Sequence, residues 1–185
     1  MIALVPIDIQ IGFRDPYWGR RGQPRAEKGM AELFAVFRER GWPIFHVQHL
    51  SVEANSPLRP DRAGVEFMDF ARPLEGEPVF RKHVNSGFIG TTLERELRAA
   101  GIAEIVPIGL TTDHCVSTTT RMAANLGFRV RLSEGAVATF DRTDFEGRTY
   151  DAETIHRTAL ASLHGEFAQV SAHADLLREL RSIEA

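Results

Sequence analysis

The feature that most constrains the fold of this chain is a regular alternation of short apolar runs with longer segments of helical periodicity. Ile2–Ile7 is apolar without interruption, as in a strand buried on both faces of a sheet. Arg25–Arg40 then places large apolar residues at helical spacing, and Gly41 closes it. Repetition of this unit along the chain predicts a parallel sheet with helices on both faces.

We expect five further strands at Ile44–Gln48, Pro78–Lys82, Glu104–Gly109, Phe128–Leu132 and Phe167–Val170, and further helices at Thr91–Ala100, Asp113–Leu126, Asp151–Leu163 and His173–Ile183. Two stretches lack a clear period: Ser51–Arg72, with a short helix expected near Val65–Phe70, and the loop Gly135–Arg148. The prediction is a three-layer α/β/α fold with a six-stranded, mostly parallel, Rossmann-like sheet. The 185 residues are expected to form one domain, 1–185.

Composition excludes several classes of function. The formal net charge is −3 and the arginines are scattered, so we expect no nucleic-acid partner. A single cysteine rules out an internal disulfide, a CxxC redox pair and a multi-cysteine zinc site. No apolar run approaches membrane-spanning length, and the first residues lack the basic start of a signal peptide. We therefore expect a cytoplasmic protein without a membrane partner.

The single cysteine, Cys115, follows the apolar run Glu104–Gly109 and a short polar turn, at the start of a helical segment. Unpaired backbone N–H groups and the helix dipole favour an anion at such a place. We therefore expect a lowered thiol pKa and a nucleophilic Cys115. An inert buried cysteine is the alternative.

Two charged residues follow other predicted strands and are candidate partners of the thiol. Asp8 ends the first strand, and it would share a crevice with Cys115 if the first and fourth strands are neighbours. It could then act as general base, although a carboxylate that only accepts backbone N–H bonds fits as well. Lys82 ends the third strand and would favour ionised partners, but spacing alone does not separate it from Arg81 or His83.

The other candidates are histidines and aromatic residues. His114 is adjacent to Cys115, and neighbours on a helix point about 100° apart, so we expect no Cys–His pair. His49 ends the second strand and could line a pocket, but it belongs to no metal motif, and we expect neither a metal nor a cofactor. Phe13 and Trp18 follow the first strand and could stack on a flat substrate or simply pack within their loop.

Three motifs taken together resemble the isochorismatase-like cysteine hydrolases, which include nicotinamidases and N-carbamoylsarcosine amidohydrolase. They are Asp8 with Gln10 and Phe13, the segment 82–88, and the segment 109–116. The resemblance runs from the first strand to the segment Leu160–Phe167. It implies a catalytic triad of Asp8, Lys82 and Cys115.

The resemblance also implies a cis peptide bond at Leu110–Thr111, which would aim the N–H groups of Thr111 and Cys115 at an oxyanion. Phe13, Trp18, His49 and Phe88 are the expected substrate-binding residues, with contributions from Phe140 and the loop 51–72. A homo-oligomer is implied, and the apolar segment Val137–Phe140 is a candidate interface. The Asp-x-His metal pattern of nicotinamidases is absent at Gln48–Ser51, which argues against a metal and against nicotinamide as substrate.

The function that these residues indicate is cysteine-dependent hydrolysis of an amide or carbamoyl carbon–nitrogen bond in a small molecule, through a thioester. Isochorismatases that cleave a vinyl ether do not use a cysteine nucleophile, so Cys115 favours carbon–nitrogen hydrolysis. Two alternatives remain. One is a vinyl-ether hydrolase with Asp8 as acid, and the other is a catalytically silent binding protein.

Overall fold

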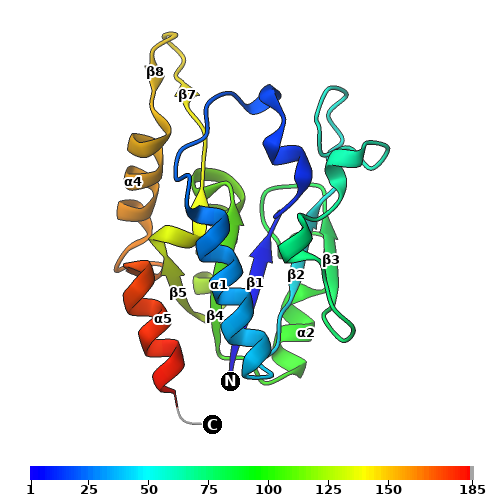
Figure 1. Cartoon of the computed structure of the whole chain (residues 1–185), viewed down its shortest axis with the longest axis vertical. Helices are drawn as coiled ribbons and strands as arrows, with labels where there is room; N and C mark the ends of the chain where they lie inside the picture. Colours follow the sequence, from blue (N-terminus) through cyan, green and yellow to red (C-terminus); the bar gives the residue numbers. More distant parts are fainter. Residues whose placement is uncertain (184–185) are drawn as a thin grey trace.

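A parallel sheet forms the centre of the protein, whose computed structural model describes residues 1–183 (Figure 1). The strands follow the order β3-β2-β1-β4-β5-β9, and the short β6 pairs with β4. Their bounds are β1 Ile2–Ile7, β2 His46–His49, β3 Val79–Lys82, β4 Glu104–Leu110, β5 Arg129–Ser133, β6 Val137–Ala138 and β9 Gln169–Ser171. All the pairs in this sheet are parallel. The predicted α/β class is confirmed.

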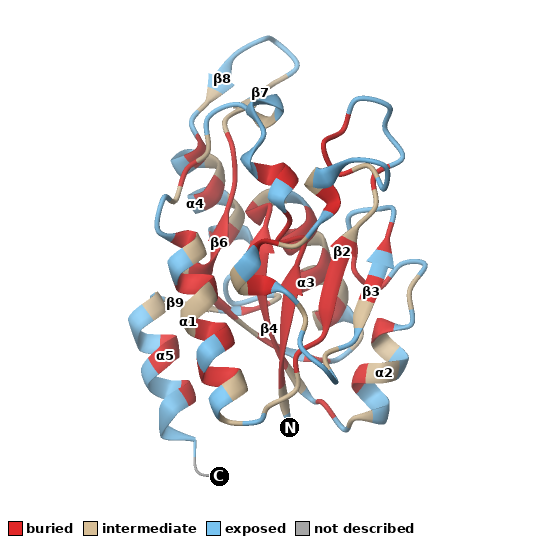
Figure 2. Ribbon diagram, turned by 45° about the vertical axis from the view of Figure 1, so that its right-hand side comes forward, coloured by how far each residue is buried: buried red, intermediate tan, exposed pale blue. Residues whose placement is uncertain are grey.

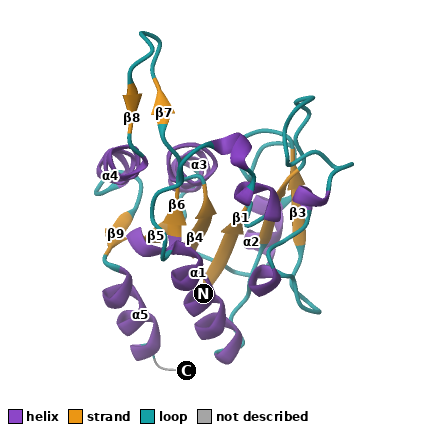
Figure 3. Cartoon of the chain, turned by 45° about the horizontal axis from the view of Figure 1, so that its top comes forward, coloured by secondary structure: helices purple, strands orange, loops and turns teal. Residues whose placement is uncertain are grey.

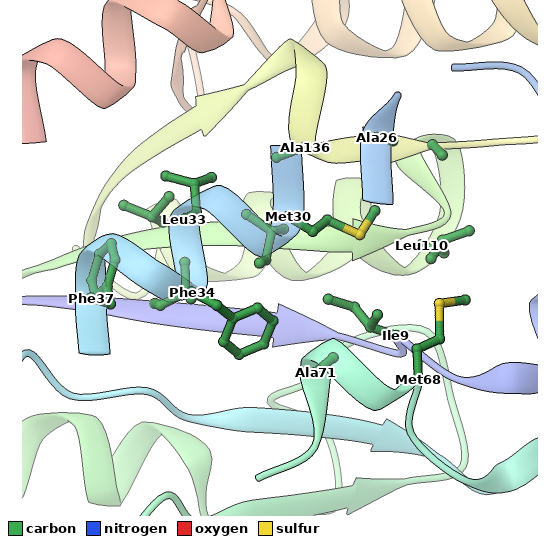
Figure 4. Packing of buried hydrophobic residues seen from close by; sticks show 14 of the residues in the cluster. Ile9, Ala26, Met30, Leu33, Phe34, Phe37, Met68, Ala71, Leu110 and Ala136 are labelled. Atoms are coloured by element: carbon green, nitrogen blue, oxygen red, sulfur yellow. The ribbon is translucent and has the colours of Figure 1, made fainter. Parts of the chain in front are cut away.

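Helices cover both faces of this sheet. They are α1 Ala26–Glu39, α2 Leu93–Ala99, α3 Ser117–Asn125, α4 Ala152–Leu163 and α5 His173–Ser182. Helices α1 and α5 pack on one face (Figure 2). Their apolar residues form a core with Leu4 and Val106, and Figure 4 shows the part of this core around Met30 and Phe34 of α1. On the other face α2, α3 and α4 pack against Val5 and Ile105. Side chains of a strand alternate between faces, so the uninterrupted apolar run of β1 supplies both cores.

Local sequence accounts for the helix limits. Helix α1 buries Met30, Leu33 and Phe37, which lie three and four residues apart on one stripe. Gly41 follows it with φ of +62°, a conformation that glycine adopts without steric cost. Asp151 caps the N-terminus of α4, because its carboxylate accepts the N–H of Thr154 at 2.6 Å.

The structure departs from the sequence-based expectation in the segment 135–148. The sequence predicts a loop with some local structure, and the segment forms β6 and then a hairpin of β7 Arg142–Thr143 and β8 Thr149–Tyr150. The hairpin extends beyond the body of the protein (Figures 1 and 3). Strands of two residues are too short for a period to be recognised in the sequence. Val137–Phe140 is buried inside the protein rather than exposed, so its suggested role as an interface is wrong.

The strand order brings the ends of β1 and β4 together. The chain runs from β1 outward through β2 to β3, and then returns to place β4 on the other side of β1. This reversal is the place where sheets of this kind bind ligands, beyond the carboxyl ends of the strands. Within residues 1–183, no helix combines the length and the apolar character needed to cross a bilayer.

Candidate active site

Asp8, Lys82 and Cys115 meet at this edge of the sheet. The Lys82 ammonium donates to Asp8 Oδ2 at 2.6 Å and to Cys115 Sγ at 3.4 Å. A carboxylate oxygen of Asp8 also lies within 4.8 Å of the sulfur. Three residues far apart in the sequence therefore share one buried cluster.

Close packing of the two central strands brings Asp8 to this position. Ile7 and Gly109 are register partners of β1 and β4. Gly109 has φ of +120°, and a Cβ at this position would lie 2.0 Å from the carbonyl oxygen of Ile7. Asp8 itself has φ of +54°, a left-handed conformation that is uncommon outside glycine. Its backbone therefore turns out of the strand directly after Ile7.

Lys82 reaches the cluster from the edge strand β3. Its register partner on β2 is His49, and β2 separates it from β1. The side chain of Lys82 is fully buried, as is that of Asp8. Lys82 therefore extends inward over the end of β2 instead of into solvent, and Arg81 and His83 remain exposed.

The helical segment that carries Cys115 begins differently from the prediction. A short π-helical turn, Thr112–Val116, precedes α3, and Cys115 lies within it. The peptide bond Leu110–Thr111 is cis. His114 lines the rim of the same pocket, with a side chain 55% exposed, and its Nε2 lies 3.4 Å from Asp113 Oδ2.

The expectation of a lowered thiol pKa is wrong. Burial raises the pKa of Cys115, and the negative charge of Asp8 raises it further. The positive charge of Lys82 acts in the opposite direction without outweighing them. Cys115 is therefore a thiol at rest, and a nucleophilic sulfur requires a base.

Lys82 retains its charge in this buried place. Burial works to lower the pKa of Lys82, but the negative charge of Asp8 overcomes that effect, so the pKa is raised. The ion pair with Asp8 compensates both buried charges. Oδ1 of Asp8 has no hydrogen-bond partner among the described residues, although it is buried. That oxygen has unused acceptor capacity beside the thiol.

A pocket of about 440 Å³ opens above this cluster. Phe13, Trp18 and His49 line it, as the sequence predicts, and so do residues of the loop 51–58. The rings of Phe13 and Trp18 lie 4.9 Å apart and form an aromatic wall. Phe140 does not line this pocket but stacks behind Phe13 at 6.1 Å.

Phe88 does not belong to this pocket, contrary to expectation. It is buried in the core beneath α2 and α3, where its ring stacks on Phe128 at 6.1 Å. The segment after β3 turns back toward Thr119, which accepts the N–H of Gly87 at 3.0 Å. This turn carries Phe88 into the core, whereas Asn85 stays at the pocket.

A comparison with known proteins matches the chain from β1 into α5. The isochorismatase domain model matches residues 2–175. The chain belongs to the isochorismatase family. The uncharacterized isochorismatase family protein YrdC of Bacillus subtilis is 41% identical over 177 residues, which cover 96% of this chain and 95% of YrdC.

Solved structures of the isochorismatase family agree with the fold. A protein described as a hydrolase of this family, from Chromobacterium violaceum, matches with a TM-score of 0.93 and 45% identity, over 98% of this chain and 94% of the other. N-carbamoylsarcosine amidase from Thermoplasma acidophilum matches with a TM-score of 0.71 and 30% identity, over 93% and 96%. Members of the family are hydrolases, and this chain is therefore a hydrolase.

The site contains three residues of types that can ligate a metal ion. Potential ligand atoms of Asp8, His49 and Cys115 lie within 4.8 Å of one another. The Lys82 ammonium contacts all three of these residues. A metal ion would have to displace this fixed cation, so the cluster does not fit a metal.

Sequence reasoning missed two groups at the pocket of this family member. Asn85 Oδ1 lies 3.6 Å from the sulfur and accepts the thiol hydrogen. Arg142, at the base of the β7–β8 hairpin, donates to Asp113 Oδ2 at 2.7 Å and to Thr111 Oγ1 at 3.4 Å. Asn85 lies within a motif of the resemblance and could have been considered. Arg142 follows a segment without a recognisable period, and the sequence offers no signal for it.

Proposed function

We propose that this hydrolase cleaves a carbon–nitrogen bond of a small amide or carbamoyl compound, with Cys115 as nucleophile and Asp8 as general base. The observation that carries the proposal is the buried contact among Asp8, Lys82 and Cys115 at the bottom of the pocket. A thiol whose pKa is raised needs a neighbouring base, and Asp8 is the carboxylate beside it.

Formation of the acyl-enzyme follows from these positions. Asp8 takes the thiol proton, and the sulfur attacks the carbonyl carbon of the substrate. The N–H groups of Thr111 and Cys115 hold the resulting oxyanion, and each such donor contributes roughly 3 kcal/mol in comparable sites. The carbon–nitrogen bond then breaks, and the leaving nitrogen takes the proton from Asp8. Ammonia or an amine departs, and a thioester remains on Cys115.

Hydrolysis of the thioester uses the same groups. Asp8 takes a proton from a water molecule, whose oxygen attacks the thioester carbon. The carbon–sulfur bond breaks and the acid product leaves, while the proton on Asp8 returns to the sulfur. Lys82 keeps its positive charge throughout and stabilises the anionic states of its two neighbours. The aromatic wall of Phe13 and Trp18 favours a flat acyl group.

Ammonia release across a panel of primary amides and ureido acids tests this function, and ring opening of lactams is followed separately by mass spectrometry. We expect the wild type to release ammonia from at least one compound and Cys115→Ala to release none, with an unchanged circular dichroism spectrum. Isochorismate belongs in the same panel. Equal cleavage of isochorismate by the wild type and Cys115→Ala, with no amide hydrolysed, would replace the proposal with vinyl-ether hydrolysis.

A further inference from the structure

His49 occupies a more central place than the rim of a pocket. It ends β2 as the register partner of Lys82. Its backbone N–H donates to Gln10 Oε1 at 2.9 Å, and Gln10 Nε2 donates back to the His49 carbonyl oxygen at 3.0 Å. Gln10 is fully buried. Both backbone hydrogen-bonding groups of His49 are therefore paired with Gln10, and this fixes the position from which its half-buried ring extends.

The ring contacts the Lys82 ammonium directly. His49 Nδ1 lies 3.1 Å from Lys82 Nζ. An ammonium has three N–H donors, and Asp8 and Cys115 accept two of them. His49 accepts the third. An acceptor nitrogen carries no proton, so the ring of His49 is neutral and its proton is on Nε2.

We propose that His49 is a positioning residue whose neutral ring holds the Lys82 ammonium over the nucleophile. The kinetic part of this inference rests on the proposed function. Without His49 the ammonium has one buried donor without an acceptor, and it is free to rotate away from the sulfur. Protonation of His49 has the same effect, because two cations would then lie 3.1 Å apart.

The charges around His49 favour its neutral form. Burial lowers the pKa of His49, and the positive charge of Lys82 on β3 lowers it further. Asp8 on β1 acts in the opposite direction. Two groups on the loops after β3 and β2, His83 and Glu53, have smaller and opposing effects. The ring therefore binds the ammonium at neutral pH and releases it in acid.

The state of the ring can be measured without a substrate. Imidazole nitrogen NMR of the resting wild type should show His49 as the Nε2–H tautomer, with a titration midpoint below those of exposed histidines. In Lys82→Met that midpoint should move to higher pH, because a neighbouring positive charge is gone. The other six histidines serve as references in the same spectrum. A proton on Nδ1, or a midpoint that Lys82→Met leaves unchanged, would overturn the inference.

Two variants separate positioning from mere packing. His49→Leu removes the acceptor, and we expect kcat to fall by roughly 100-fold, as for a misplaced catalytic group, with KM little changed. His49→Asn restores an acceptor near the position of Nδ1 that cannot be protonated. It should recover most of the loss and retain activity to lower pH than the wild type.

Each outcome of these measurements has a definite meaning. A wild-type kcat and pH profile in His49→Leu would contradict the positioning role. So would zinc binding by the resting wild type that His49→Leu abolishes, since it would show that His49 serves a metal. If no amide is hydrolysed by the wild type, the proposed function fails, whereas the NMR result still decides whether His49 binds the ammonium.

Discussion

Replacing Lys82 with methionine tests the buried ion pair on which the site depends. Lys82 Nζ and Asp8 Oδ2 lie 2.6 Å apart, and both side chains are fully buried. At an effective dielectric constant of about 20, two charges at that distance attract by roughly 6 kcal/mol. The cost of burying both charges offsets much of this attraction. Loss of one partner leaves an uncompensated buried charge, and we expect Lys82→Met to lower the free energy of unfolding by about 3–5 kcal/mol.

Urea unfolding at neutral pH measures this loss, and a thermal scan should show a melting temperature lower by roughly 10 °C. Lys28→Met is the matched control, because Lys28 is 78% exposed and lies 3.8 Å from Glu32 on the same helix. That variant should differ from the wild type by no more than about 0.5 kcal/mol. The double variant Asp8→Asn/Lys82→Met should regain part of the stability, since it buries no charge. Equal effects of Lys82→Met and Lys28→Met would show that the buried ion pair does not stabilise the fold.

Three further predictions concern the thiol of Cys115, the carboxylate of Glu77 and the close contact between β1 and β4. Burial and a neighbouring carboxylate raise the pKa of Cys115. Its alkylation by iodoacetamide should therefore be slow at pH 7 and should still accelerate above the ordinary thiol pKa of about 8.5. Rapid alkylation at pH 6 would contradict this. Burial works to raise the pKa of Glu77, but hydrogen bonds led by that from Arg38 lower it to about 2. Glu77 therefore contributes about 3 kcal/mol of stability that is present above pH ~4.3 and lost as the pH falls toward 2, and Glu77→Gln should remove this part of the acid dependence in urea titrations. Gly109→Ala should destabilise the protein by more than about 3 kcal/mol, because the added Cβ would strike a backbone oxygen of β1. Gly127→Ala is the control: it is also at positive φ, but nothing lies within 4 Å of the added Cβ, and it should cost about 1 kcal/mol. Similar melting temperatures of the two variants would contradict the close contact.

The sheet was predictable because its strands are buried on both faces. Uninterrupted apolar runs such as Ile2–Ile7 and Glu104–Gly109 mark such strands, and every expected strand lies within two residues of its predicted bounds. Asp8 and Cys115 could be found for the same reason, since each follows one of these runs. The strands β6 to β8 could not be found, because two residues carry no period.

Side-chain partners were less predictable than backbone elements. The choice of Lys82 over Arg81 came from the family resemblance, because spacing does not reveal which side chain of an edge strand turns inward. The contact between His49 and Lys82 depends on the register of β2 and β3, which no local pattern encodes. Phe88 was misplaced because an aromatic residue after a strand can turn into the core as easily as into a pocket.

The prediction for the thiol failed for an electrostatic reason. The sequence shows that Cys115 begins a helical segment, and a helix start favours an anion. It does not show how deeply the sulfur is buried or how near Asp8 lies. Both effects oppose ionisation, and they outweigh Lys82. This places proton transfer to Asp8 at the centre of the proposed chemistry.

The rate of acyl-enzyme formation shows whether Asp8 takes the thiol proton. A substrate identified by the ammonia panel is mixed with excess enzyme, quenched at short times, and the mass added to Cys115 is followed. We expect a transient acyl adduct in the wild type and an acylation rate lower by about 10²–10⁴-fold in Asp8→Asn. Acylation of Asp8→Asn as fast as that of the wild type would show that another group takes the thiol proton.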